Sequence, residues 1–448
     1  MQNKGISLIV LVITIIVMII LAAAVIISLN NTGIIGNANK AKDMTNESQI
    51  KEMAQIAWLE GKHEGKTGEE LNTYVQESLK KSIPENNLKD YIVVVKDTKI
   101  AILPSAWKDT ISDMQDNVPI PKGFVASNAT GENKKSTGLV IYEGEEEVTD
   151  VNVEEARRTR NQYVWVPVED MSNFIRQDFG KNDAKKLDNS TTINIETSWE
   201  ISPNMEYNEN AMTQEELSEV KNMYASVEKY KGFYVARYQA GIDVPRASDT
   251  LKGKNVSSKM NKYVYRYPRK STAKEIARSI YPTTDNTTGV VSTLMYSVQW
   301  DTTVKWLLDT GAIANVTDST AYGNYVNHEI KKGDVNKGAK YAIYKDSWTI
   351  SDFMDAEDAT KSSGEAWLLT AGALKTSTTN NIYDMAGNLW EQTMEYCYTR
   401  TLTSLVYFST FRSGSCFKNG SNSIAHRWLG SNDFSDVATF RTSLYIKL

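Results

Sequence analysis

The sequence predicts an α+β fold behind an N-terminal transmembrane helix. Residues 6–29 form one uncharged apolar run, which at ~1.5 Å per residue is long enough to cross the ~30 Å hydrocarbon core of a bilayer. The other apolar segments are mostly short and are separated by Asn, Ser, Thr, Gly and Asp, which favours short strands and loops with few long helices. A chain of 448 residues is long enough for about two or three domains.

The composition argues against several classes of function. The 50 Lys and Arg residues are interspersed with 55 Asp and Glu residues, which disfavours a nucleic-acid partner. The chain has only two cysteines, Cys397 and Cys416, and three scattered histidines. A zinc site or a disulfide scaffold is therefore not expected, although one disulfide between the two cysteines stays open.

The apolar run at residues 6–29 is interpreted as a membrane anchor. A secretory signal peptide is the alternative, because the alanines at residues 22–24 suit a cleavage site, but its apolar region is normally only about 7–15 residues long. The short tail before the run carries Lys4, which favours a cytoplasmic N terminus. We therefore expect a single-pass protein of the cell membrane with the bulk of the chain extracellular.

Residues 1–30, a short tail that ends at Gly5 and the apolar run that follows it, resemble the prepilin-type leader and N-terminal helix of type IV pilins. The peptidase of that family cuts after a glycine that precedes an apolar run, and Gly5 and Ile6 match the two sides of the cut. The resemblance implies a processed protein of the bacterial cell surface. Pilins usually have Glu at the fifth residue after the cut, where this chain has Val10. That departure argues against assembly into a filament.

Residues 31–115 are expected to form a small, pilin-like α+β stalk and a linker. Residues 50–59 are typical of an amphipathic helix, and residues 91–103 of two strands around a polar turn. Pro104 and the proline- and glycine-rich residues 118–123 bracket a polar stretch, which indicates a linker. The domain boundary is predicted near residue 116.

Residues 116–448 are expected to form the larger domain. Strands are predicted at residues 139–142, 163–168 and 233–237, and helices at residues 213–230, 273–280 and 296–311. Core positions are expected for Trp165, Trp300, Trp306 and Trp367, because aromatic side chains dominate burial.

Several segments of this domain, in their order along the chain, resemble the formylglycine-generating, sulfatase-modifying enzyme family. They are residues 163–168, 232–241, 300–301, 365–367, 382–391, 411–415 and 440–441. The most specific are the run Tyr-Asp-Met-Ala-Gly-Asn-Leu-Trp-Glu, the Arg-Ser-Gly-Ser and the final Phe-Arg. The resemblance covers residues 116–448 and implies a C-type lectin-like fold.

Catalysis is not expected from this resemblance. Oxidases of the family bind copper through two cysteines about five residues apart, as soft copper(I) prefers thiolate ligands. Here Cys416 has Ser421 at that spacing, and Cys397 lies well upstream. A binding domain is therefore favoured over the two alternatives, a sulfatase-modifying oxidase and a structural minor pilin.

The same resemblance implies a calcium site in the turn at residues 384–391. Matched position by position, its ligands are the side chains of Asp384 and Glu391 and the carbonyl groups of Gly387 and Leu389. Oxygen ligands of these two kinds are what calcium takes in proteins. The alternative is a tight turn in which the two carboxylates only accept hydrogen bonds.

Residues 416–439 are predicted to carry the ligand-binding surface. Aromatic side chains stand here among Asn, Ser, Gly and Asp, a composition typical of antibody-like surfaces. The segment also resembles the diversified C-terminal segment of C-type lectin-like variable proteins of diversity-generating retroelements. Its candidate ligand contacts are Cys416, Phe417, His426, Trp428, Leu429, Phe434 and Asp436. The alternative is that Phe417 and Phe434 pack in the core.

The predicted function is that of a membrane-anchored surface protein that displays a C-type lectin-like domain to an extracellular protein or glycan. Trp428 and Phe434 are its expected aromatic anchors, because they lie in a segment too polar for an ordinary core strand. No catalytic residue is assigned.

Overall fold

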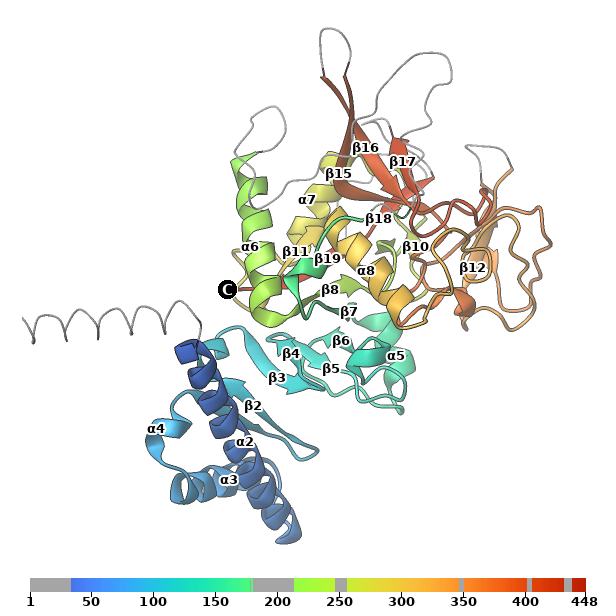
Figure 1. The fold of residues 1–448 in the computed structure, drawn as a ribbon. Coiled ribbons are helices and arrows are strands. Elements are labelled where there is room, and N and C mark those ends of the chain that lie inside the picture. Colours follow the sequence, from blue (N-terminus) through green and yellow to red (C-terminus); the bar gives the residue numbers. More distant parts are fainter. Residues whose placement is uncertain are drawn as a thin grey trace, which may run out of the picture. The chain divides into compact units, whose positions relative to one another are not determined.

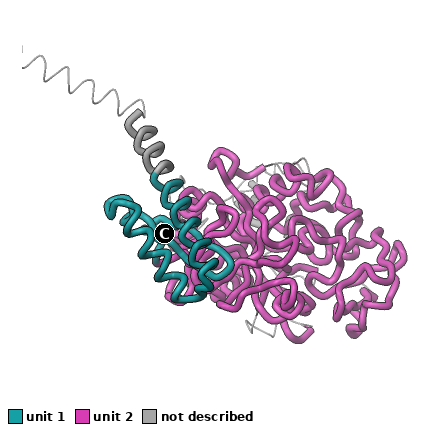
Figure 2. The backbone as a smooth tube through the Cα atoms, turned by 90° about the horizontal axis from the view of Figure 1, so that it is seen from below, with its two compact units in different colours: residues 1–108 teal, residues 109–448 magenta. Residues whose placement is uncertain are grey.

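The computed structural model describes residues 34–177, 179, 213–245, 256–345, 350–400, 405–430 and 437–448. The chain divides into two compact units, residues 1–108 and 109–448, which Figure 2 shows in different colours. The sequence predicted a boundary near residue 116 and a linker bracketed by Pro104 and residues 118–123. In the structure β4 (Val118–Pro121) is a buried strand of the second unit and pairs with β3 (Ile111–Gln115). These two strands form a sheet of their own, where proline is tolerated at an edge.

The first unit has α2 packed with α3 and two strands. Its described elements are α2 (Ile34–His63), α3 (Gly68–Ser82), α4 (Glu85–Leu88), β1 (Tyr91–Val95), β2 (Ile100–Pro104) and a 3₁₀ helix, Ser105–Trp107. Ile50, Ala54 and Ala57 recur at helical spacing on α2 and share one core cluster with Leu71 and Val75 of α3. The predicted strand pair is confirmed, with β1 antiparallel to β2.

The second unit is built around an antiparallel sheet of six strands (Figure 1). Its spatial order is β11 (Val290–Leu294), β19 (Thr442–Ile446), β8 (Gly232–Ala236), β7 (Gln162–Pro167), β6 (Val140–Glu143) and β5 (Phe124–Ala126). The C-terminal strand β19 therefore lies between β11 and β8, which come from the middle of the chain. The strands predicted at residues 139–142, 163–168 and 233–237 are confirmed as β6, β7 and β8.

A second sheet carries the C-terminal motifs. Its order is β17 (Arg427–Gly430), β16 (Leu405–Arg412), β15 (Trp390–Arg400) and β18 (Ala438–Phe440). The strands β15, β16 and β17 are antiparallel neighbours, and β18 runs parallel to β15. The smaller sheets contain β9 (Gly241–Ile242), β10 (Tyr263–Val264), β12 (Lys340–Ile343), β13 (Met354–Asp355) and β14 (Trp367–Leu369).

The larger helices of the second unit pack against these strands. The helices are α5 (Val153–Thr159), α6 (Gln214–Tyr230), α7 (Lys270–Ile280) and α8 (Ser297–Asp309), with 3₁₀ turns at Lys135–Thr137, Met171–Asn173 and Lys375–Ser377. The three predicted helices are confirmed as α6, α7 and α8. The first of them, α6, begins at a capping box between Thr213 and Glu216, which satisfies two backbone N–H groups at its start.

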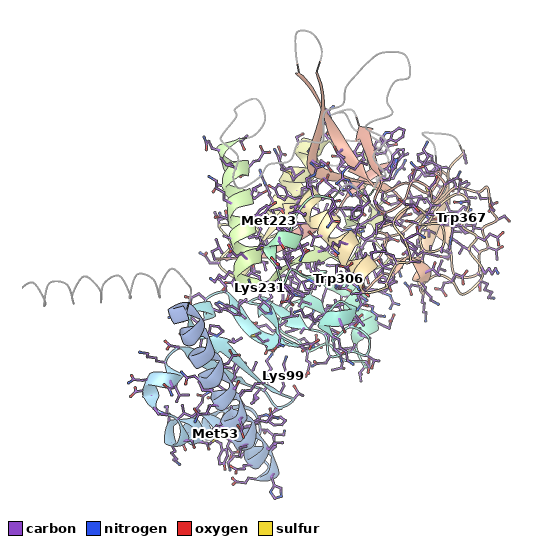
Figure 3. All side chains as sticks on the ribbon, in the orientation of Figure 1. Met53, Lys99, Met223, Lys231, Trp306 and Trp367 are labelled. Atoms are coloured by element: carbon purple, nitrogen blue, oxygen red, sulfur yellow. The ribbon has the colours of Figure 1, made fainter. Side chains whose placement is uncertain are left out.

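The fold class is α+β, as the sequence predicted. Trp165, Trp300, Trp306 and Trp367 are all buried, and Figure 3 labels two of them together with the buried Met223 of α6. No helix among the described residues is long and apolar enough to span a membrane. The predicted anchor at residues 6–29, with Gly5 and Ile6, lies outside the described residues.

Candidate ligand-binding surface

Four aromatic side chains from β15, β16, β17 and the loop after β16 stack on one another. We name Trp390, Phe411, Phe417 and Trp428 the aromatic cluster. The rings of Trp390 and Trp428 are nearly parallel, with centroids 5.6 Å apart. Trp390 is also parallel to Phe411 at 6.5 Å and meets Phe417 edge-on at 5.6 Å. Offset stacking and edge-to-face contact are the two geometries that aromatic pairs prefer.

The strand register explains why three of these rings meet. Phe411 of β16 lies directly opposite Trp428 of β17 and Gln392 of β15. Trp390 lies two residues from Gln392, on the same face of the sheet and within diagonal reach of Phe411. The cluster is therefore a product of strand pairing between residues that are far apart in sequence.

Burial divides the aromatic cluster into a base and a surface. Phe411 and Trp390 are buried, with 4% and 6% of their surface exposed, whereas Phe417 and Trp428 are half-buried. The indole Nε1 of Trp390 is buried and donates to no atom of the described residues. Phe417 and Trp428 are thus the rings that a ligand can touch, resting on a rigid aromatic base.

Lys418 completes the aromatic cluster with a positive charge. Its Nζ lies 5.4 Å from the ring centroid of Phe417, 5.8 Å from that of Trp390 and 5.9 Å from that of Trp428. Each distance is within the ~6 Å range of a cation–π contact. Sequence reasoning missed this residue, although Lys418 is the one lysine of residues 416–439 and directly follows Phe417.

The backbone around Phe417 and Lys418 is held from both sides. The Cys416 N–H donates to the Asn388 carbonyl at 2.9 Å, and the Lys418 carbonyl accepts from the Val326 N–H at 3.0 Å. The Lys418 N–H closes a turn onto the Ser415 carbonyl at 2.9 Å. The two surface side chains therefore project from a backbone that is already ordered.

The structure separates the predicted ligand contacts into three groups. Phe417 and Trp428 lie together at the surface. Cys416 and His426 are buried, so they support this surface from below and do not form it. Cys416 forms no disulfide with any residue that the structure describes, and the side chain of Cys397 lies outside the described residues. The backbone of Leu429 pairs with Thr410, while the side chain of Leu429 and both Phe434 and Asp436 lie outside the described residues.

The opposite face of the same sheet carries charges. Arg412 of β16 and Arg427 of β17 lie directly opposite each other, one residue along each strand from Phe411 and Trp428. Their Nη2 atoms both contact Asp301 of α8, that of Arg412 at 2.6 Å. The Nε of Arg427 also contacts Glu395 at 3.1 Å. All four side chains have no more than 2% of their surface exposed.

These buried charges are stabilised by one another. Burial alone lowers the pKa of Arg427, but the carboxylates of Glu395 and Asp301 raise it above its usual value. A buried charge that loses its partner is costly, because no water replaces the lost contact. The ion pairs therefore fix the positions of β16 and β17 under the aromatic cluster. We name Asp301, Glu395, Arg412 and Arg427 the buried ion-pair framework.

The turn predicted to bind calcium is occupied by protein contacts. Asp384 accepts from the Gly372 N–H at 2.7 Å and from the Ser377 hydroxyl at 2.8 Å. Glu391 pairs with both Nε and Nη2 of Arg441, at 3.0 and 2.7 Å. These bonds support the hydrogen-bonded turn, and calcium at Asp384 and Glu391 stays a prediction.

Two further features of the turn agree with a rigid structural role. The Leu389 carbonyl accepts from the Gln239 amide at 3.0 Å. Gly387 has φ of 77°, and a Cβ atom there would lie 2.5 Å from the Asn324 carbonyl oxygen, so only glycine fits. No three His, Cys, Asp or Glu side chains in the described part of the chain are grouped to hold a metal ion.

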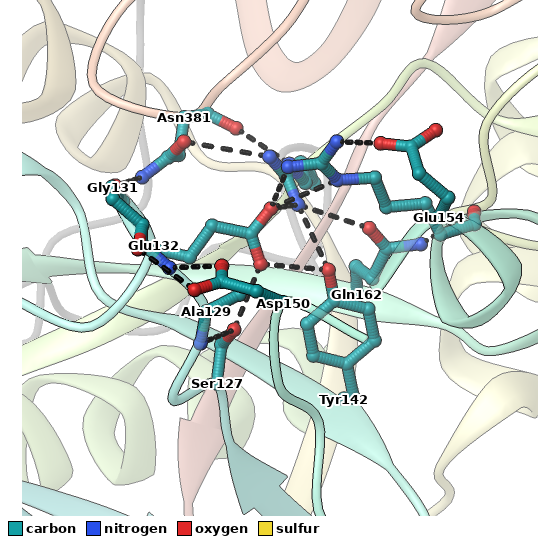
Figure 4. A network of polar contacts seen from close by, with 12 residues as sticks. Ser127, Ala129, Gly131, Glu132, Tyr142, Asp150, Glu154, Gln162 and Asn381 are labelled. Atoms are coloured by element: carbon teal, nitrogen blue, oxygen red, sulfur yellow. Dashed lines mark hydrogen bonds and ion pairs between the residues drawn. The ribbon is translucent and has the colours of Figure 1, made fainter. Parts of the chain in front are cut away.

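A second buried network lies at the other sheet and is drawn in Figure 4. One oxygen of Glu132 accepts from Arg157 at 2.6 Å and from Arg237 at 2.7 Å, and the other accepts from Tyr142 at 2.8 Å. Burial would raise the pKa of Glu132, but Arg237 and Arg157 lower it, to about 2. Arg237 belongs to the segment 232–241 that carries part of the family resemblance. Its role in the structure is to hold strands together.

Comparison with known proteins does not identify a family. No protein-family model matches the chain. A search of curated proteins also finds no match. The resemblances noted in the sequence therefore stay predictions.

Proposed function

We propose that residues 109–448 form a ligand-binding domain whose contact surface is built on Phe417, Trp428 and Lys418. The observation that carries this proposal is the aromatic cluster itself. Two half-buried rings and an ammonium group are presented on an ordered backbone, above a buried base. Such aromatic anchors dominate binding energy at protein surfaces.

We further propose that this domain has the C-type lectin-like fold of the formylglycine-generating enzyme family. The support is that the quoted motifs converge on buried ion pairs. Asp301 of the Trp-Asp motif pairs with Arg412 of the Arg-Ser-Gly-Ser motif, and Glu391 pairs with Arg441 of the final Phe-Arg. An accidental likeness of short segments would not bring their charged residues together. That the protein is itself a diversified variable protein of a diversity-generating retroelement belongs to the same proposal.

We propose that this domain lies outside the cell and is anchored in the membrane by residues 6–29. Its support is the uncharged apolar run of the sequence and the short basic tail before it. Protease added to intact cells tests it, with a known surface protein as the control. We expect the second unit to be digested together with the control. Protection of the second unit contradicts the proposed orientation.

The binding proposal is tested on the full chain with Trp428→Ala. The matched control is Tyr341→Ala, because Tyr341 is also half-buried and stacked on a tryptophan, Trp367, with centroids 3.9 Å apart. Both proteins are applied to an array of purified proteins and glycans. We expect Trp428→Ala to lose the ligands that the wild type retains, by at least about tenfold in affinity. Equal loss in both variants, or in neither, contradicts the proposal.

A further inference from the structure

The ammonium group of Lys418 has no carboxylate partner among the residues that the structure describes. It forms no ion pair and no side-chain hydrogen bond with any residue that the structure describes, although it is half-buried among three rings. Cation–π contacts hold an ammonium group in place but leave its charge unneutralised. Lys229 of α6, 4.9 Å above the Tyr230 ring, makes a similar contact at an exposed position away from the cluster. Lys418 is therefore a localised positive charge inside an apolar surface.

The apolar surface around Lys418 extends beyond the aromatic cluster. Tyr344, Ile350 and Phe353 are also half-buried and pack against the same core cluster, and the ring of Tyr344 lies 5.7 Å from that of Phe417. This surface joins segments about seventy residues apart in sequence. Aromatic residues in such an arrangement are typical of the core of a protein–protein interface.

Arg266 lies beside this surface but is buried, with 3% of its surface exposed. The guanidinium carbon of Arg266 is 5.8 Å from the ring centroid of Tyr344 and 4.9 Å from that of Tyr267. A ligand can therefore reach the half-buried Lys418 but not Arg266. The chemical complement of an apolar surface with this positive charge is an apolar segment that carries negative charge.

We propose that this surface recognises an acidic protein segment. A carboxylate of an Asp or Glu in the ligand pairs with Lys418, while neighbouring apolar side chains of the ligand rest on Trp428 and Phe417. A charge-assisted hydrogen bond to an ammonium group that is already partly desolvated is stronger than one formed in open water. The held backbone at Cys416 and Lys418 reduces the entropy lost on binding. This inference rests on the proposed function and adds the charge of the ligand to it.

The test uses the full chain and an array of random-sequence peptides that differ in net charge. The variants are Lys418→Met, which keeps the length of the side chain and removes its charge, and Lys418→Arg, which keeps the charge. Lys229→Met is the control. We expect the wild type, Lys418→Arg and Lys229→Met to enrich peptides that contain Asp or Glu beside apolar residues. Lys418→Met should bind those peptides about tenfold more weakly and lose the enrichment.

Salt provides a second measurement. Binding of acidic peptides to the wild type should weaken as ionic strength rises, because salt screens the charge of Lys418. The remaining binding of Lys418→Met should show a smaller salt dependence. A salt dependence equal in the two proteins overturns the inference.

Other outcomes are equally decisive. Enrichment of neutral or basic peptides overturns the inference, and so does acidic enrichment that survives in Lys418→Met. Retention of an acidic oligosaccharide, such as oligogalacturonate, without retention of acidic peptides also overturns it. Trp428→Ala separates this failure from failure of the proposed function. If that variant loses ligands of any charge while Lys418→Met binds normally, the aromatic surface binds a ligand and only the acidic selectivity is wrong.

Discussion

The two faces of the β15–β16–β17 sheet use the same strands for opposite purposes. On one face Phe411 and Trp428 stack with Trp390, and the stack ends in half-exposed rings beside Lys418, which pairs with no carboxylate of the described residues. On the other face Arg412 and Arg427 are buried and paired with Asp301. Neighbouring residues of one strand differ this much because side chains alternate between the faces of a sheet. The comparison indicates that the charged motifs stabilise the fold, and that recognition belongs to residues beside them.

The largest expected effect comes from breaking the buried face. Asp301→Asn leaves Arg412 and Arg427 without their shared carboxylate, and we expect the free energy of unfolding to fall by ~3–5 kcal/mol. Asp309→Asn is the control, because Asp309 pairs with Lys305 at an exposed position and should cost no more than ~0.5 kcal/mol. Urea unfolding followed by tryptophan fluorescence measures both. A similar small loss in the two variants shows that the buried face is not held by its ion pairs.

The pH dependence of stability tests whether the buried ion pairs of Glu132 also stabilise the fold. Its folded pKa of about 2 lies below the ordinary value of 4.5, so its stabilising effect is complete above pH 4.5 and is lost as pH falls toward 2. Glu132→Gln does not titrate. The stability difference between wild type and Glu132→Gln should therefore shrink by ~3 kcal/mol over this range. The exposed Glu154, which also pairs with Arg157, provides the control Glu154→Gln, for which the difference should stay nearly constant.

Truncation of two tryptophans compares the aromatic surface with the core. Trp428→Ala removes a half-buried ring, and we expect a stability loss of ~1–2 kcal/mol together with loss of binding. Trp300→Ala empties a fully buried site whose indole donates to the Ile424 carbonyl at 2.9 Å, and we expect a loss of ~3–5 kcal/mol. Thermal unfolding measures both. If Trp428→Ala destabilises as strongly as Trp300→Ala, Trp428 is a core residue and not a contact residue.

The smallest expected effect concerns the turn at residues 384–391. Asp384 and Glu391 already accept hydrogen bonds from Ser377 and Arg441, so a chelator is expected to leave the melting temperature unchanged. A bound calcium ion would instead raise stability by RT ln(1 + [L]/Kd), about 2.7 kcal/mol at a hundredfold excess over Kd. Melting curves with and without chelator separate the two readings. A clear fall in melting temperature on chelation supports the calcium site that the sequence predicted.

The features that could be predicted from sequence alone are those that depend on residues close together in the chain. The α+β class, the strand pair at residues 91–103 and the positions of β6, β7, β8, α6, α7 and α8 follow from local periodicity and from turn-forming residues. The burial of Trp300 and Trp367 follows from residue type, since large aromatic side chains gain most from leaving water. Composition and resemblance predicted Phe417 and Trp428 as ligand contacts, and both side chains are half-exposed.

Only the tertiary structure decided which of the neighbouring residues face solvent. Cys416, Phe417 and Lys418 are consecutive, yet the first is buried and the other two are half-exposed, because hydrogen bonds to Asn388 and Val326 set the direction of the loop. The tertiary structure also decided which residues pair with the charged motifs. Arg412 reaches Asp301 across more than a hundred residues, and no local pattern encodes such a contact. Sequence specified the residue types and the local elements. Long-range strand pairing determined which charges were neutralised, and it left Lys418 without a carboxylate among the residues that the structure describes.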